Sequence, residues 1–410
     1  YGAAAALVLG PQYFPNFSPV AGVLAAFGTF AAGFVARPIG GLLFGHFGDR
    51  LGRKRTLIAS LLLMGVGTLL VAVLPTYEQI GVAAPLVLVL LRIVQGLGVG
   101  GEWGGAVLMA IEHAPRGRRA FYSSFPQMGI PSGIILSNVV FLAVGAVTTS
   151  DQFGAWGWRI PFLFSALLVV TALIIRLKLE ESPEFADTRE RGAVRRLPAV
   201  DVLRTSSRSV VLGMGVSFAP SAIGYLFSVY LLSYGTREVG LPQQTLLLLI
   251  TLASVCYLAF AYVSGRIADR VGPRRVFLGS MALSLVAPFG CFLLFETATV
   301  SGALTSLVIL GVLLGFMVGV QAIIVSGAFE TSLRYTGASL SYQLGAVLGG
   351  GLTPLLATAI FAATGSTQFV AGYIAALVIV SAICVYLLPT SPRGDELAEP
   401  SPGAVATGAS

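Results

Sequence analysis

Long apolar runs, each followed by a short polar turn, recur along the whole chain. A run of about 20 apolar residues is long enough to cross the hydrocarbon layer of a bilayer as a helix. Proline, glycine and charged residues mark where the runs stop. They divide the chain into twelve predicted helices, at residues 1–14 (partial), 20–47, 55–75, 84–112, 121–147, 158–178, 209–235, 243–266, 275–296, 302–329, 336–364 and 367–389. The pattern predicts an all-α integral membrane protein.

The first of these runs differs from the others. Residues 1–14 are too few to span a bilayer at 1.5 Å per residue, and the run does not begin with Met. We interpret it as the outer part of a first helix whose beginning is missing. It lacks a basic stretch ahead of the apolar run, so it does not have the pattern of a signal peptide.

Composition agrees with a membrane protein. Of 410 residues, 56% are hydrophobic and 10% are charged, whereas a soluble domain carries far more charge. A net charge of +7 need not indicate nucleic acid, because Lys and Arg gather on cytoplasmic loops. The three cysteines lie inside apolar runs and there are only two histidines. We therefore expect no disulfide, no metal site and no cofactor.

The basic residues orient the helices. One set of alternate loops contains residues 50–55, 116–119, 176–208 and 266–275, together with Arg334 and Arg393, and the other set contains little more than Arg159 and Arg237. The Lys- and Arg-rich set belongs in the cytoplasm. With twelve spans, both termini are expected in the cytoplasm of a multi-pass protein of the cell membrane.

Polar segments divide the chain into parts. Residues 1–180 are predicted to form an N-terminal six-helix bundle and residues 209–389 a C-terminal one. Residues 181–208 form a long polar stretch between them, which we interpret as a cytoplasmic linker. Residues 390–410 are rich in Pro, Ser, Gly and Ala, a composition that predicts a disordered tail.

One charged turn occurs twice. "GHFGDRLGRKRT" begins at Gly45 and "GRIADRVGPRRV" begins at Gly265. Asp49 corresponds to Asp269 and Arg50 to Arg270, whereas Arg53 is replaced by a proline. Each copy joins the second and third helix of its half. The chain is therefore predicted to contain two copies of one six-helix unit, and such duplication is typical of secondary transporters.

At these residues the chain resembles a known family. "GHFGDRLGRKR" is similar to the G-x-x-x-D-R-x-G-R-[RK] loop of the major facilitator superfamily. "RIVQGLGVGGEWGGAVLMAIEHAP", "SSFPQMGIPSG" and "RYTGASLSYQLGAVLGGGLTP" look like its metabolite:proton symporter branch. The resemblance implies twelve helices in two pseudo-symmetric bundles. It also implies a monomer that carries an organic acid, or a zwitterion such as proline or betaine, together with protons.

Charges at the cytoplasmic helix ends are candidates for a gate. Asp49 can cap the N-terminus of a neighbouring helix, and the glutamates that end the fourth and tenth helices can pair with loop arginines. Such pairs could hold the two halves closed on the inner side. The alternative is that they only anchor loops among lipid headgroups. The candidate gate residues are Asp49, Arg50, Arg53, Glu112, Asp269, Arg270 and Glu330.

A second group of polar residues lies inside the predicted spans, where a charge costs several kcal/mol unless it is paired or meets water. Arg37 and Glu102 lie at similar depths on parallel helices, so we predict that they come within ion-pair reach, directly or through water or substrate. The pair could couple substrate to protons, or it could be permanent and structural. Arg92 could serve a cavity or snorkel to the surface. Gln95 and Glu102 are seven residues apart and share a helix face.

The second half carries no deep charge. Its polar groups could bind a small solute by hydrogen bonds, although each one alone could equally join helices. The complete set of candidates for the substrate and proton pathway is Arg37, Arg92, Gln95, Glu102, Gln127, Tyr225, Gln321 and Gln343.

The sequence fits other functions less well than transport of a metabolite. A proton-linked drug antiporter of the same fold would bind large apolar cations, to which a cavity with arginines is poorly suited. A membrane enzyme would need paired carboxylates, a histidine cluster or a nucleophile with its base, and a receptor would need a sizeable soluble domain. No G-x-x-x-x-G-K-[ST] loop occurs, so the sequence does not favour direct drive by ATP.

Overall fold

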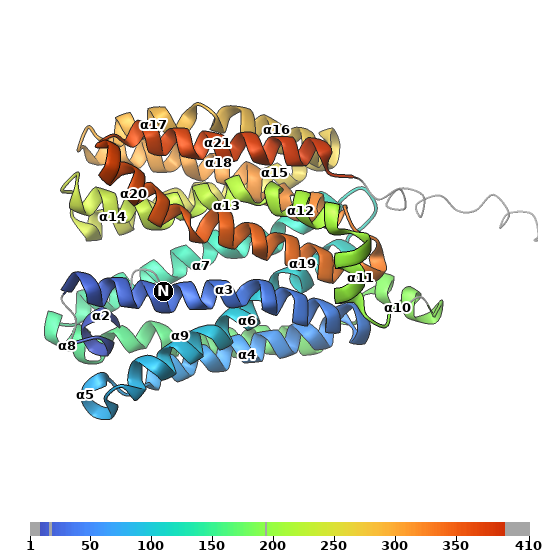
Figure 1. Cartoon of the computed structure of the whole chain (residues 1–410), viewed down its shortest axis with the longest axis horizontal. Coiled ribbons are helices and arrows are strands. Elements are labelled where there is room, and N and C mark those ends of the chain that lie inside the picture. The colour runs from blue at the N-terminus through green and yellow to red at the C-terminus, as the bar shows by residue number, and fades with distance from the viewer. Residues whose placement is uncertain (1–8, 16–18, 193–194, 390–410) are drawn as a thin grey trace, which may run out of the picture.

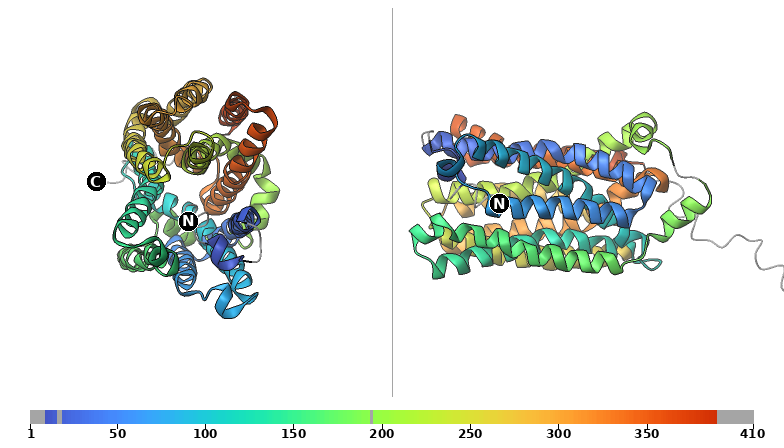
Figure 2. Two further views of the ribbon diagram at one scale, coloured as in Figure 1. Left: turned by 90° about the vertical axis from the view of Figure 1, so that its left-hand side faces the viewer. Right: turned by 90° about the horizontal axis from the view of Figure 1, so that it is seen from below.

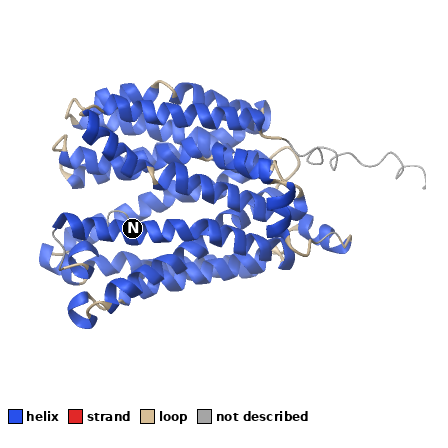
Figure 3. Ribbon diagram, in the orientation of Figure 1, coloured by secondary structure: helices blue, strands red, loops and turns tan. Residues whose placement is uncertain are grey.

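The computed structural model describes residues 9–15, 19–192 and 195–389. The predicted tail at 390–410 and the first eight residues lie outside this range. All regular elements of the described residues are helices (Figure 3).

We call residues up to Lys178 the first half. Its helices are α2 (Gly10–Tyr13), α3 (Pro19–Leu51), α4 (Arg53–Val73), α5 (Tyr77–Ile80), α6 (Ala83–Glu112), α7 (Arg119–Val147), α8 (Ser150–Ala155), η2 (Gly157–Arg159) and α9 (Ile160–Lys178). Two short helices, α10 (Pro183–Glu190) and α11 (Pro198–Thr205), lie in the segment predicted as a linker.

We call residues from Ser207 onward the second half. Its helices are α12 (Ser207–Val216), α13 (Phe218–Tyr225), η3 (Leu226–Tyr230), α14 (Leu231–Arg237), α15 (Gln243–Val271), α16 (Pro273–Ser284), α17 (Ala287–Phe295), α18 (Val300–Ser326), η4 (Thr331–Leu333), α19 (Arg334–Gly345), η5 (Ala346–Gly351), α20 (Thr353–Thr364) and α21 (Thr367–Leu387). Here η3 and η5 are π-helical segments within longer helices.

Nine helices of the described residues are long and apolar enough to cross a membrane, and a tenth span forms if α16 and α17, bent by 46°, count as one. The 33-residue helix α3 and the short α2 come in addition. This arrangement is consistent with the twelve predicted helices, although the described residues do not by themselves give that count.

The two halves lie side by side, with their long helices parallel or antiparallel to one another (Figure 1). The end-on view in Figure 2 shows the helices of both halves seen along their axes. Helices α10 and α11 lie together at one end of the molecule, on the right in Figure 1. We call this the linker end.

Helix α3 is held between its own half and the other half by glycines. A Cβ atom on Gly40 would lie 2.1 Å from the carbonyl oxygen of Leu97 in α6. A Cβ on Gly45 would lie 2.6 Å from the Cα of Thr336 in α19. Neither position has room for a side chain, so glycine permits the backbones to approach this closely. Helix α3 therefore carries its polar residues directly to the boundary between the halves.

Candidate functional site

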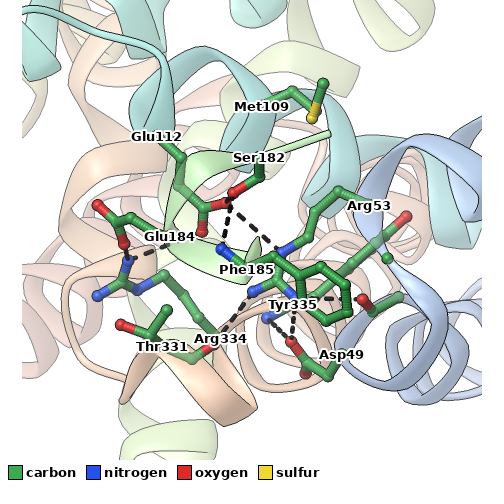
Figure 4. Close-up of polar contacts among 12 residues, drawn as sticks. Asp49, Arg53, Met109, Glu112, Ser182, Glu184, Phe185, Thr331, Arg334 and Tyr335 are labelled. Carbon is green, nitrogen blue, oxygen red and sulfur yellow. Dashed lines mark hydrogen bonds and ion pairs between the residues drawn. The ribbon is translucent and has the colours of Figure 1, made fainter. Parts of the chain in front are cut away.

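A buried arginine organises the linker end. Arg53 begins α4, and its side chain is 1% exposed. Its guanidinium lies 3.3 Å from the carboxylate of Asp49 and 3.5 Å from that of Glu112. It also donates to the carbonyl oxygen of Thr331, in the second half, at 3.1 Å. Figure 4 shows these groups converging. Charges this deeply buried are stable only when they are paired and hydrogen-bonded.

Asp49 joins the two halves directly. It ends α3, and its carboxylate accepts hydrogen bonds from the backbone N–H of Tyr335 at 3.3 Å and of Thr336 at 2.9 Å. The hydroxyl of Thr336 adds a third at 2.8 Å. These donors lie in the first turn of α19, where a helix leaves backbone N–H groups without internal partners and favours a negative charge. Asp49 therefore caps a helix of the other half.

The linker contributes carboxylates of its own. Glu181 accepts from the backbone N–H of Arg53 at 2.9 Å, at the start of α4. Glu184 lies between Arg119 of the first half, at 2.8 Å, and Arg334 of the second half, at 2.6 Å. Arg334 also lies 3.8 Å from Glu112. We call Asp49, Arg53, Glu112, Glu184 and Arg334 the charge cluster.

Glu112 is held from the linker side as well. The hydroxyl of Ser182 donates a hydrogen bond to its carboxylate, and the same hydroxyl oxygen accepts from the backbone N–H of Phe185 at 3.2 Å. The ring of Phe185 lies 4.9 Å from the guanidinium of Arg53, as a cation–π contact. The linker is therefore part of the contact between the halves.

The second copy of the turn is simpler. Asp269 ends α15 and accepts from the backbone N–H of Ala120 at 2.9 Å and of Phe121 at 3.2 Å, in the first turn of α7. It therefore caps a helix of the first half, as Asp49 caps one of the second. Glu330 is 59% exposed and pairs with Arg195 of the linker at 3.9 Å, outside the charge cluster.

Two further candidate gate residues also lie outside the charge cluster. Arg50 and Arg270 are exposed, and neither forms an ion pair within the described part of the chain.

Further from the linker end than the charge cluster, aromatic and amide side chains cross the boundary between the halves. Trp103 of α6 stacks on Tyr342 of α19 with ring centroids 3.9 Å apart and an interplanar angle of 1°. The indole N–H donates to Gln127 of α7 at 2.8 Å, and the amide of Gln127 donates to the carbonyl of Val318 at 3.1 Å. Gln343 donates to the carbonyl of Val99 at 3.2 Å. Together these contacts form a second layer across the boundary.

Arg37 lies further from the linker end. Its Nη1 is 3.5 Å from the hydroxyl of Tyr225, and its guanidinium lies 3.8 Å from the centre of the Phe34 ring. Tyr225 ends α13 in the second half, so this contact also crosses the boundary. Arg37 is half-buried and forms no ion pair among the residues that the structure describes.

The direct ion pair predicted between Arg37 and Glu102 is not formed. Glu102 pairs instead with Arg176, near the end of α9, whose Nη1 lies 3.1 Å from the carboxylate. Ser60 of α4 also donates to this carboxylate at 3.4 Å. The reason is that Glu102 lies on the face of α6 that packs against α4. Gly98, four residues earlier on α6, packs against α4, and residues four apart share a face.

The remaining candidates lie within single halves. Arg92 donates to Gln95 at 3.0 Å, and Gln95 donates to the hydroxyl of Thr68 in α4 at 3.0 Å. Gln95 and Glu102 thus both face α4, as their spacing predicts. Gln321 donates to Ser217 at 2.9 Å within the second half. Within the described ranges no group of three or more His, Cys, Asp or Glu side chains is arranged to hold a metal ion.

Several residues that join the two halves and the linker were not predicted from the sequence. Trp103 has a polar N–H in a glycine-rich apolar helix, which is a signal that could have been used. Glu181 and Glu184 lie at the start of the linker, in a stretch richer in acidic residues than the other cytoplasmic loops. Their charge opposes that of the neighbouring loops, and this also could have indicated contact.

Three comparisons place the chain among known proteins. The profile described as Major Facilitator Superfamily matches residues 5–338 and also residues 212–408. The "Shikimate transporter" of Escherichia coli is 38% identical over 401 residues, covering 96% of this chain and 91% of that protein. The "Citrate-proton symporter" of Klebsiella pneumoniae is 32% identical over 361 residues, covering 88% of this chain and 81% of that protein.

Among solved structures, one of the E. coli proton:xylose symporter XylE, bound to 6-bromo-6-deoxy-D-glucose, superposes with a TM-score of 0.77. The two chains are 17% identical, and the match covers 95% of this chain and 93% of the other. At this identity the likeness concerns the fold.

Proposed function

The chain belongs to the Major Facilitator Superfamily, and from this premise we propose that it carries a small organic acid or zwitterion across the membrane together with protons. It is a multi-pass membrane transporter rather than an enzyme. The proposal concerns its cargo, its coupling to protons and the way its two halves move.

The charge cluster is the observation that carries the proposal that the two halves move against each other. Residues of both halves and of the linker meet there, and Asp49, Arg53 and Glu112 are almost fully buried. A transporter that works by alternating access must open and close such a contact while its halves rock around the substrate site. When the halves separate, these charges regain water, which offsets part of the lost attraction.

The cluster also supports an orientation. The linker end carries most of the basic loops, and cytoplasmic loops are enriched in Lys and Arg. We therefore place the linker end in the cytoplasm. In the conformation described above, the pathway is closed on that side, first by the charge cluster and then by the layer around Trp103.

Coupling to protons is supported by relatives rather than by one residue. One relative is named a citrate–proton symporter. In this chain Glu102 is held by Arg176 and Ser60 on the face toward α4 and α9. This geometry favours the structural interpretation of Glu102 over the coupling one. Glu102→Gln should therefore lower the melting temperature while leaving the response of transport to a pH gradient in place.

The test is uptake into proteoliposomes that contain the purified full chain. Labelled shikimate, citrate, proline and glycine betaine are offered under an imposed gradient, acidic outside. Accumulation of at least one solute is expected, and a protonophore should abolish it. Accumulation that persists at the same level with the protonophore would falsify proton coupling while leaving transport itself intact.

A further inference from the structure

The charge of Arg37 lies inside the membrane-spanning part of α3, where it is energetically costly. It lies twelve residues before Asp49 on α3, or about 18 Å further from the linker end. A charge near the middle of a span is costly to insert unless it is paired or meets water, so such residues usually mark a functional site. Intramembrane arginines are usually satisfied by an anion or by carbonyl groups.

Two other arginines near the spans have such partners. Arg176 is paired with Glu102. Arg159 donates to the carbonyl oxygens of Ala72 at 2.9 Å and of Leu74 at 3.0 Å. Arg37 differs, because its contacts within the described ranges are one hydroxyl at 3.5 Å and one aromatic ring. A distance of 3.5 Å is at the limit of a hydrogen bond, so a guanidinium with five N–H donors is under-used here.

Its surroundings hold it in position at the boundary between the halves. The rings of Phe34 and Tyr225 meet edge to face, with centroids 5.3 Å apart. A Cβ atom on Gly350 would lie 2.5 Å from the Tyr225 ring, and one on Gly351 would lie 3.2 Å from Phe34. Both glycines belong to the π-helical segment η5, and Tyr225 directly precedes the π-helical segment η3. Such π-helical turns occur frequently at functional sites.

We propose that Arg37 and Tyr225 together bind the carboxylate of an anionic substrate, one residue from each half. The guanidinium supplies the charge and two parallel N–H donors, and the phenol supplies one O–H donor. This inference rests on the proposed transport function. A carboxylate held by both halves contacts both moving bodies at once, which lets bound substrate favour one arrangement of the halves over another.

The charge balance around Arg37 selects an anion rather than a zwitterion. The described carboxylates of the interior face other cations, since Glu102 pairs with Arg176 and Asp49 with Arg53. None of them is paired with Arg37, so the site supplies a positive charge without a neighbouring acid to receive an ammonium group. One face of the Phe34 ring is already covered by Arg37 itself, which reduces its use as a cation–π surface for a quaternary amine.

Equilibrium binding to the purified full chain, with no gradient, tests this proposal. Benzoate, shikimate and citrate are compared with benzamide, proline and glycine betaine by calorimetry. At least one of the three anions is expected to bind, whereas neutral benzamide and the zwitterions proline and glycine betaine are expected not to. Arg37→Gln should weaken binding of that carboxylate by about 100-fold. Tyr225→Phe should weaken it by about tenfold, as expected when one hydrogen bond to a charged group is lost.

Matched controls separate the site from general damage. Tyr230→Phe removes a hydroxyl one turn away, in an aromatic cluster with Tyr234 and Phe292. Arg266→Gln removes an exposed arginine near the linker end. Neither should change the affinity. Arg37→Lys, which keeps the charge but loses the parallel donors, should bind about tenfold more weakly than the native chain, and the melting temperature of each variant shows that it is folded.

Several results would overturn the proposal. One is that glycine betaine binds as tightly as the best of the three anions. Another is that a folded Arg37→Gln variant keeps the native affinity. The third is that none of the three anions binds the native chain. Each can occur while gradient-driven uptake persists, in which case only the assignment of the carboxylate site is wrong. Conversely, binding without any gradient-driven accumulation contradicts symport and leaves the carboxylate site standing.

Discussion

The two copies of the charged turn form the same contact in different surroundings. Asp49 and Asp269 each lie in the last turn of a long helix, α3 and α15, and cap a helix of the other half. Asp49 is 2% exposed and lies beside Arg53, whose guanidinium also reaches Glu112. Asp269 is only partly buried, and proline replaces the cation. The capping geometry is thus common to both halves, while the charge cluster is built on one copy alone.

This difference bears on how the linker end opens. A cap made with backbone N–H groups loses little when water replaces the carboxylate. Separating a buried group of paired charges costs more free energy, because a charge that stays buried without its partner is uncompensated. We therefore expect the contact between the halves around Asp49 to resist opening more strongly than the contact around Asp269.

The largest effect should come from Arg53→Gln. It leaves Asp49 and Glu112 buried without their shared cation, which should cost the closed arrangement about 3–5 kcal/mol. The melting temperature should fall, and a cysteine placed at Ser339, buried between the halves, should react with a thiol reagent added from the linker end. Unchanged reactivity together with an unchanged melting temperature would show that the cluster does not hold the halves together.

A smaller effect separates the two capping residues. Asp49→Ala should cost about 2–3 kcal/mol, because it removes a cap and one of the two carboxylates that pair with Arg53. Asp269→Ala should cost about 1 kcal/mol, because it removes a cap alone. Denaturation in matched detergent gives both values. Equal costs would mean that the neighbouring charges add nothing, and the asymmetry inferred above would have to be abandoned.

The linker contact should matter less. Glu184→Gln should cost about 0.5–1 kcal/mol, in the range of a partly exposed ion pair, since the Glu184 side chain is 23% exposed. A double-mutant cycle with Arg334 should show stronger coupling than one with Arg119. The Arg334 side chain is 11% exposed and the Arg119 side chain is 43% exposed, and water screens the more exposed pair more strongly. The reverse order would indicate that Glu184 belongs mainly to the first half.

The smallest effect is expected from restoring the missing cation. Pro273→Arg should change stability by no more than about 0.5 kcal/mol. Glu330, which matches Glu112 in the repeat, is 59% exposed and already meets Arg195, so a new arginine gains no buried partner. A gain above about 1 kcal/mol, measured by the same denaturation, would show that the second copy can build a cluster after all.

The helices themselves were predicted closely, and where a boundary moved the cause is local. The span expected at 243–266 continues to Val271, and the one expected at 20–47 continues to Leu51. The charged residues were assigned to the loop, yet they extend the helix. The break comes only at Gly52 and Gly272, with φ of 114° and 94°, a backbone conformation that glycine adopts readily.

The candidate site was predicted less completely. The depth of Arg37 and of Glu102 follows from counting residues, but their partners do not. Trp103 and Glu102 are neighbours on α6, about 100° apart around the helix axis. One meets Tyr342 across the boundary, and the other meets Arg176 inside the first half. Spacing shows that two residues share a face, but it does not show which neighbour that face meets.

The sequence alone determined the membrane-spanning helices, the duplicated turn and the distance of each charge from a helix end, because apolar run length and a rise of 1.5 Å per residue fix these quantities locally. Only the tertiary structure decided that Glu184 of the linker joins the charge cluster and that Arg37 faces Tyr225. The direction of a helix face is set by which glycines pack against which neighbouring backbone, and the residues that make those contacts are distant from one another in the chain.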